Sequence, residues 1–256
     1  METLGTRNRE SCLYPENLSD SRGASAVLFL LSLCPPKIGL PPEPCILLNK
    51  RSKLVRQAGD LCFPGGGIVP HVDSIGARLL GLPFFPLGRW PHWKEWRRLR
   101  RKESTRLALL LATGLRESLE EMRLNPFGVE FLGPMPAQTL LSFQRVIYPL
   151  MVRIRNQKRF FTNREVEKVV SIPIKDLLEP EKYIRYRMHF ESSQNGNNET
   201  LRDFPGFFHD DGEDREVLWG ATYHIVVTFL EIVFGFSPPE ITFSNIIEGC
   251  RGENYF

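Results

Sequence analysis

The stretch that most constrains this chain is Ala112 to Leu124, ATGLRESLEEMRL, read together with the earlier loop Phe63 to Gly67, FPGGG. Glu117, Glu120 and Glu121 stand at positions i, i+3 and i+4, which places all three carboxylates on one face of an α-helix. Like charges at these spacings destabilise a helix by about 0.2–0.5 kcal/mol per pair. The cluster therefore indicates either a solvated acidic surface or a site where a divalent cation compensates the carboxylates.

The residues around these glutamates separate a packing face from a charged face. Leu115, Leu119 and Met122 form an apolar stripe at helical spacing. Arg116 lies four positions before Glu120 and can hold that carboxylate in an i, i+4 ion pair. We therefore expect a helix that packs on one side and binds cations on the other.

This helical stretch resembles the signature of the Nudix hydrolase family, which reads Arg-Glu, two positions, Glu-Glu, two positions and an aliphatic residue. The corresponding residues are Arg116-Glu117, Glu120-Glu121 and Leu124. The family has glycine where Arg123 stands, so we expect the turn after the helix to be built differently. The resemblance implies an α/β fold, an α/β/α sandwich with a mixed sheet, and hydrolysis of a nucleoside diphosphate bond with Mg²⁺ or Mn²⁺ as cofactor.

The segment that ends in the glycine loop, LLNKRSKLVRQAGDLCFPGG, resembles the additional motif of the coenzyme A pyrophosphatase branch of this family. Asn49 replaces the common threonine, and the spacing from Arg56 to Gly59 is one residue shorter than usual. The resemblance implies that arginines here bind phosphate and that glycines allow close backbone approach. The matching residues are Leu47, Leu48, Arg51, Ser52, Arg56, Gly59, Phe63, Pro64, Gly65 and Gly66, of which Arg51, Arg56, Phe63, Pro64, Gly65 and Gly66 are expected to bind substrate.

A large helical insertion separates the two halves of the signature. They are 50 positions apart (Gly66 to Arg116), whereas the family joins them with little more than a dozen residues. The insertion is expected at about residues 74–111. The early glutamate of the family, eight residues before the arginine, falls on Ala108. Asp73 can take its place only if the inserted segment loops out and the helix resumes near Thr105.

The insertion combines tryptophans spaced three apart with a basic run. Three functional interpretations are a grip on an anionic nucleotide tail, contact with a membrane surface, and binding of single-stranded nucleic acid. A helical hairpin whose tryptophans pack onto the core is favoured over these, because aromatic stripes are more often core than site. The residues concerned are Trp90, Trp93 and Trp96, followed by Arg97, Arg98, Arg100, Arg101 and Lys102.

Apolar and β-branched runs predict the other elements of the domain. We expect strands at 26–33, 45–50, 129–132, 146–154 and 169–174, and a helix at 216–234 that packs on the sheet. The chain is accordingly divided into a loosely ordered leader (1–23), a Nudix-like domain (24–236) and a C-terminal tail (237–256).

Composition narrows the class of partner. A net charge of +3 predicts mild attraction to anionic small molecules and does not require nucleic acid. Five scattered cysteines without a CxxC pair predict a reducing, cytoplasmic setting. No apolar run reaches the roughly 20 residues that a membrane span needs. A small nucleotide is the expected partner, and a homodimer is compatible with the sequence.

Three hypotheses for function follow from these features. The first is metal-dependent hydrolysis of coenzyme A or acyl-CoA by water, giving a 4′-phosphopantetheine product and adenosine 3′,5′-bisphosphate. Here Glu117, Glu120 and Glu121 hold the metal and form the catalytic set with Arg116. The second is an ADP-ribose or nucleotide-sugar pyrophosphatase. The third is a catalytically weak nucleotide-binding protein, motivated by Ala108 and Arg123.

Overall fold

The computed structural model describes residues 14, 23–34, 41–140, 145–190, 200–210, 212, 215–240 and 246–251 of the 256-residue chain. The expected leader at residues 1–23 lies outside these ranges except for Tyr14 and Gly23. The first strand begins at Ala24.

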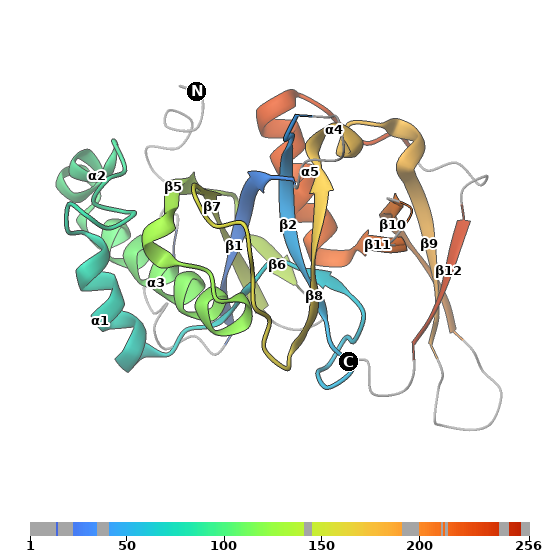
Figure 1. Ribbon diagram of the computed structural model, residues 1–256, viewed down its shortest axis with the longest axis horizontal. Helices are drawn as coiled ribbons and strands as arrows, with labels where there is room; N and C mark the ends of the chain where they lie inside the picture. The colour runs from blue at the N-terminus through green and yellow to red at the C-terminus, as the bar shows by residue number, and fades with distance from the viewer. Residues whose placement is uncertain are drawn as a thin grey trace.

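An eight-stranded mixed sheet forms the centre of the molecule (Figure 1). Its middle strand, β1 (Ala24–Leu33), runs parallel to β7 (Arg145–Ile154) and antiparallel to β2 (Pro44–Arg51). These strands and β5 and β8 confirm the strands predicted from apolar runs. The remaining strands are β3 (Leu61–Cys62), β4 (Gly65–Gly67), β5 (Val129–Pro134), β6 (Gln138–Leu140) and β8 (Val166–Pro173).

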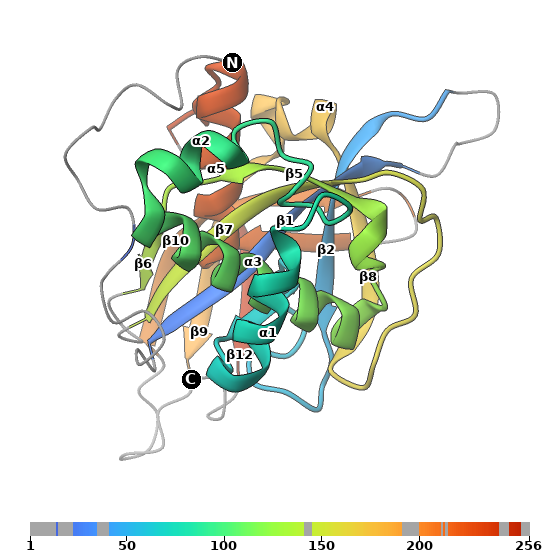
Figure 2. The ribbon, with the colours of Figure 1, turned by 90° about the vertical axis from the view of Figure 1, so that its left-hand side faces the viewer.

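Helices cover both faces of this sheet, which confirms the expected α/β/α arrangement. The long helix α3 (Arg101–Met122) packs on one face, and α1 (Pro70–Leu80) and α2 (Trp93–Leu99) pack on α3 (Figure 2). The opposite face carries α5 (Gly220–Phe234) and the short α4 (Ile174–Leu177). Among the described residues, no helix combines the length and apolar character needed to cross a bilayer.

Side chains along β1 alternate between the two faces of the sheet, and each face carries a hydrophobic core. Leu28 and Leu30 point to the α3 face, where they join leucines of that helix. Phe29 points to the other face, and its ring lies 4.6 Å from that of Phe229 on α5. Both sides of the strand are therefore buried, as its almost continuous apolar sequence requires.

A second, four-stranded sheet in the order β11-β10-β9-β12 completes the fold. Residues 246–251, assigned from the sequence to a tail, form β12 and pair in parallel with β9. Two 3₁₀ helices, Pro126–Gly128 and Pro180–Lys182, precede β5 and β9. The strands are β9 (Tyr183–Phe190), β10 (Thr200–Asp210), β11 (Arg215–Trp219) and β12 (Ile246–Arg251).

The helix predicted at 216–234 begins four residues later than expected. Residues 215–219 pair with β10 as β11, and α5 starts at Gly220. Glu216 and Leu218 are buried in alternation along this strand, and Gly220 adopts a φ of +63°. A glycine in the left-handed region thus marks the change from strand to helix.

Candidate active site

The glycine strand β4 brings the backbone against the acidic face of α3. A Cβ atom at Gly65, whose φ is +156°, would lie 2.2 Å from the carbonyl oxygen of Ala26. A Cβ atom at Gly66 would lie 2.5 Å from the carboxylate carbon of Glu117. Gly65 therefore requires glycine, because its Cβ would meet backbone, whereas Gly66 leaves the space that the Glu117 carboxylate occupies.

Arg116 is the centre of the hydrogen bonding at this site. Its Nη1 donates to Oε1 of Glu117 at 2.9 Å and to Oε1 of Glu120 at 3.5 Å. Its Nη2 donates to the Gly67 carbonyl oxygen at 3.1 Å, which connects α3 to the glycine strand. Burial disfavours the charged form of the Arg116 guanidinium, but Asp73 and Glu117 favour it and hold its pKa above the ordinary value. The predicted i, i+4 pair is thus one part of a larger network.

Asp73 supplies the acidic partner that Ala108 cannot. Its buried carboxylate accepts hydrogen bonds from Arg116 Nε at 2.7 Å, Thr113 Oγ1 at 2.9 Å and the Val69 amide at 2.7 Å. The segment between α1 and α3 does loop out and forms α2, as expected from the sequence. The helix resumes at Arg101, four residues before the expected Thr105, and α3 is continuous from there to Met122.

Close packing of α1 on α3 makes this substitution possible. A Cβ atom at Gly76 would lie 3.2 Å from Cβ of Ala112, so the two helices approach closely one turn after Asp73. The Asp73 carboxylate and Arg116 therefore come from two different helices, and the two residues are 43 positions apart in sequence.

Glu121 is held by Asn49, the residue that stands where the resembling motif commonly has threonine. Asn49 is buried on β2, and its Nδ2 donates to Oε2 of Glu121 at 2.8 Å. The only signal in the sequence was a polar residue that ends the apolar run of β2. We refer to the four acidic residues gathered here as the carboxylate cluster: Asp73, Glu117, Glu120 and Glu121.

Burial makes the negative charge of this cluster costly. Burial raises the pKa of the Glu117 carboxyl despite Arg116, and burial followed by the charge of Glu117 raises the pKa of Glu121 to about 7. Formally, four carboxylates face two guanidinium groups, those of Arg116 and Arg51. A bound divalent cation would offset this negative charge and favour the ionised form of Glu121.

The donor set fits a hard divalent cation such as Mg²⁺ or Mn²⁺, which prefers carboxylate oxygens. The absence of a side chain at Gly66 lets the Glu117 carboxylate lie against the backbone of β4. Within the described ranges, no three acidic, histidine or cysteine side chains surround one point as ready-made ligands. Arg116 draws two of the glutamates to itself and Asn49 holds the third.

The predicted substrate residues divide into two groups. Arg51 lies near the cluster, since its charge acts on Glu121, and its Nε donates to the Arg56 carbonyl oxygen at 2.8 Å. The Arg56 side chain is exposed on the loop. Phe63 and Pro64 are buried, and the Phe63 ring packs 4.6 Å from that of Phe29. These two residues shape the loop from within the core.

The turn after α3 corrects the expectation drawn from Arg123. This residue ends the helix with φ 56° and ψ 37°, the left-handed conformation that glycine usually supplies. Its amide donates to the Leu119 carbonyl oxygen at 3.1 Å, and the Leu124 amide donates to that of Ser118 at 3.2 Å. The turn therefore has the geometry of a glycine turn with arginine in the strained position.

The tryptophans of the insertion are part of the core. Trp90 and Trp93 are buried, and Trp96 is partly buried against the same cluster. The Trp90 ring lies 5.0 Å from the ring of Phe131 on β5. The favoured interpretation of the insertion, packing of the tryptophans onto the core, agrees with this arrangement.

Comparison with known proteins gives structural matches only. No family model and no curated protein matches the chain. Solved structures of Nudix hydrolases are similar to it. RenU from M. smegmatis is 12% identical over 61% of this chain and 73% of its own, with a TM-score of 0.37. A Nitrosomonas europaea Nudix hydrolase is 12% identical over 91% and 81%, with a TM-score of 0.42. The Nudix domain of Shewanella oneidensis NrtR, solved with ADP ribose, is 16% identical over 62% and 77%, with a TM-score of 0.36.

Proposed function

We propose that this protein hydrolyses the diphosphate bond of coenzyme A or an acyl-CoA, releasing a 4′-phosphopantetheine product and adenosine 3′,5′-bisphosphate. The observation that supports hydrolysis is the convergence of the carboxylate cluster, Arg116 and the glycine strand β4. The observation that supports the substrate is the motif LLNKRSKLVRQAGDLCFPGG, whose Arg51 carries a charge that favours the ionised form of Glu121. The cytoplasmic setting stays a prediction.

Glu117, Glu120 and Glu121 would hold Mg²⁺ or Mn²⁺, which when bound polarises the diphosphate and lowers the pKa of coordinated water. Arg116 fixes the Glu117 and Glu120 carboxylates through Nη1. Glu120 or Glu121 accepts the proton of the attacking water. The water oxygen forms a bond to one phosphorus, the bridging P–O bond breaks, and the departing phosphate keeps the electron pair.

ADP-ribose or a nucleotide sugar is the second candidate substrate. The observation that favours it is the position of Arg56, which is exposed while its carbonyl oxygen binds Arg51. Coenzyme A carries a third phosphate that calls for a further cation, whereas ADP-ribose has only the diphosphate. With Arg51 as the arginine near the carboxylate cluster and Arg56 exposed, the site suits ADP-ribose, the ligand with fewer phosphates.

A substrate panel tests the proposal. The purified chain is incubated with Mg²⁺ and coenzyme A, ADP-ribose or NADH, and products are separated by anion-exchange chromatography. Release of adenosine 3′,5′-bisphosphate from coenzyme A alone is the expected result. Turnover of ADP-ribose alone would move the assignment to the second candidate. Tight binding without turnover of any substrate would support the nucleotide-binding protein.

Glu120→Gln tests the catalytic set. Glu120 is exposed, so the substitution leaves the fold intact and removes one charge from the acidic face of α3. We expect turnover to fall by about 100-fold or more. Glu181→Gln, at an exposed glutamate on the other side of the sheet, is the matched control and should retain activity. Full activity in Glu120→Gln would contradict the assignment of this residue.

A further inference from the structure

The insertion concentrates the positive charge of the chain. Residues 70–106 contain nine Lys and Arg against three Asp and Glu, a net charge of +6. The rest of the chain contains 24 Lys and Arg against 27 Asp and Glu, a net charge of −3. The proposed hydrolysis uses only Asp73 of this segment, so its charge calls for a separate explanation.

An apolar stripe runs along the outer face of α1. The inner face, with Asp73, Gly76 and Leu80, packs toward α3. On an adjacent face, about 100° around the helix axis, several large apolar side chains are exposed at helical spacing, and others follow in the connection to α2. These are Val72, Ile75, Leu79, Leu82 and Phe84, the last with 81% of its surface exposed.

The stripe leads directly to the cations of α2. A Cβ atom at Gly81, which follows α1, would lie 3.4 Å from the Trp93 ring, so the end of α1 touches the start of α2. The Arg97 guanidinium lies 5.9 Å from the centre of the same ring. Figure 2 shows α1 and α2 both on the side turned to the viewer, with α2 above α1. Further exposed cations here are Lys94, Arg98 and Arg101.

We propose that this face, formed by the α1 stripe and the α2 cations, docks on an anionic lipid bilayer. Exposed aliphatic side chains next to Lys and Arg are what interfacial membrane binding requires, since the first enter the acyl boundary and the second meet phosphate headgroups. A nucleic acid would share the charge complementarity but would need aromatic faces for stacking. Trp90 and Trp93 are buried, and apart from Phe84 the exposed apolar side chains of the stripe, Val72, Ile75, Leu79 and Leu82, are aliphatic.

Vesicle co-sedimentation of the full chain tests the proposal. We expect binding to phosphatidylcholine vesicles that contain phosphatidylserine, weaker binding to pure phosphatidylcholine, and loss of binding at high salt. The charge variant Lys94→Glu with Arg98→Glu should lower affinity by about 25-fold or more, because each cation contributes roughly fivefold near an anionic surface. The apolar variant Leu82→Asp with Phe84→Asp should lower it by about tenfold or more.

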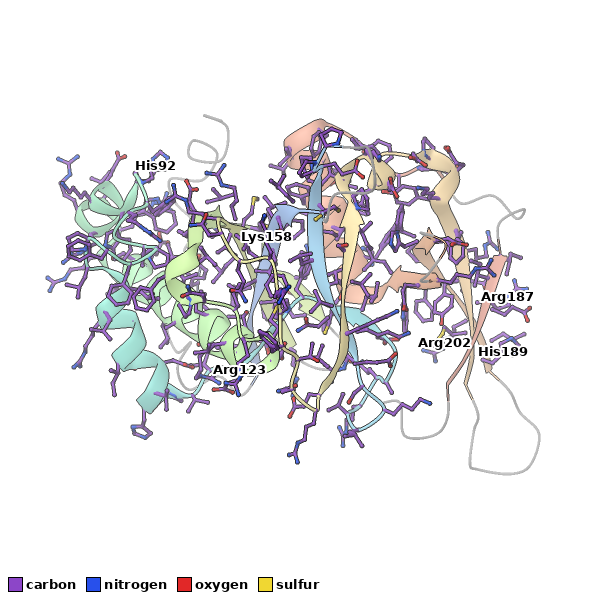
Figure 3. All side chains as sticks on the ribbon, in the orientation of Figure 1. His92, Arg123, Lys158, Arg187, His189 and Arg202 are labelled. Atoms are coloured by element: carbon purple, nitrogen blue, oxygen red, sulfur yellow. The ribbon has the colours of Figure 1, made fainter. Side chains whose placement is uncertain are left out.

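Two matched controls lie on β10, at the opposite end of the molecule from α2. Arg202→Glu and Leu201→Asp change an exposed cation and an exposed apolar residue there, and should bind vesicles like the unmodified chain (Figure 3). Circular dichroism should show all variants folded, and diphosphate hydrolysis should be unchanged. The proposal would be overturned by equal vesicle binding in variants and controls, or by a complete lack of vesicle binding by the unmodified chain. It would also be overturned if the unmodified chain bound an oligonucleotide but not vesicles, and the charge variant lost the oligonucleotide binding. It would also be overturned if the apolar variant dissociated a dimer in sedimentation velocity.

Discussion

The pair between Asp73 and Arg116 should be the most strongly coupled ion pair of the site, and a double-mutant cycle measures it. The Asp73 side chain is 1% exposed and that of Arg116 is 17% exposed, so water screens the pair weakly. Arg116 donates to Asp73 through Nε at 2.7 Å and through Nη2 at 3.3 Å. The single variants are Asp73→Asn and Arg116→Gln, and the double variant closes the cycle.

The expected magnitude follows from these contacts. Removing one partner of a buried ion pair costs about 3–5 kcal/mol of unfolding free energy. When Asp73 is changed, Arg116 keeps Glu117 and Gly67 as hydrogen-bond acceptors. We therefore expect a loss of unfolding free energy at the lower end of this range, about 3 kcal/mol. Of this, about 2 kcal/mol should appear as coupling between the two side chains, since hydrogen bonds to charged groups contribute about 1.5–3 kcal/mol.

Urea unfolding of the four proteins, followed by circular dichroism, gives the coupling energy. The matched control is the surface pair Arg153–Glu130, which also has two hydrogen bonds but side chains 56% and 38% exposed. Its coupling should stay below about 1 kcal/mol. If the coupling of Asp73 with Arg116 is no larger than that of the control, the role given to Asp73 is wrong.

Three further predictions concern the same region. Gly66→Ala should change the unfolding free energy by no more than about 1 kcal/mol but lower turnover by about 100-fold, because the new Cβ displaces the Glu117 carboxylate. The control is Gly67→Ala, where a Cβ atom meets nothing within 4 Å, and it should change neither the unfolding free energy nor turnover. Arg123→Gly should raise the unfolding free energy by about 1 kcal/mol in urea, because it relieves the left-handed strain at the end of α3, and no gain would show that Arg123 is not strained. Removal of divalent ions with EDTA should abolish hydrolysis and added Mg²⁺ or Mn²⁺ should restore it, whereas activity that persists in EDTA would exclude the metal-dependent mechanism.

The sequence by itself determined the local elements of the site. Apolar runs predicted β1, β2 and β7, and the spacing of the three glutamates placed them on one helix face, because strand alternation and helical periodicity depend on neighbouring residues only. It also indicated that Arg116 would hold Glu120. Local spacing did not reveal β11, because its few residues adjoin a strongly apolar helix and become a strand only by pairing with β10.

Tertiary structure alone decided the partners that come from distant segments. Asp73 reaches Arg116 because α1 folds back on α3, and Asn49 reaches Glu121 because β2 lies beneath the same helix. The end of α3 is likewise held by a distant residue, since Gln157 donates from Nε2 to the Arg123 carbonyl oxygen at 2.9 Å. Contacts of this kind depend on how elements pack, and packing is a property of the whole chain that no single window of sequence contains.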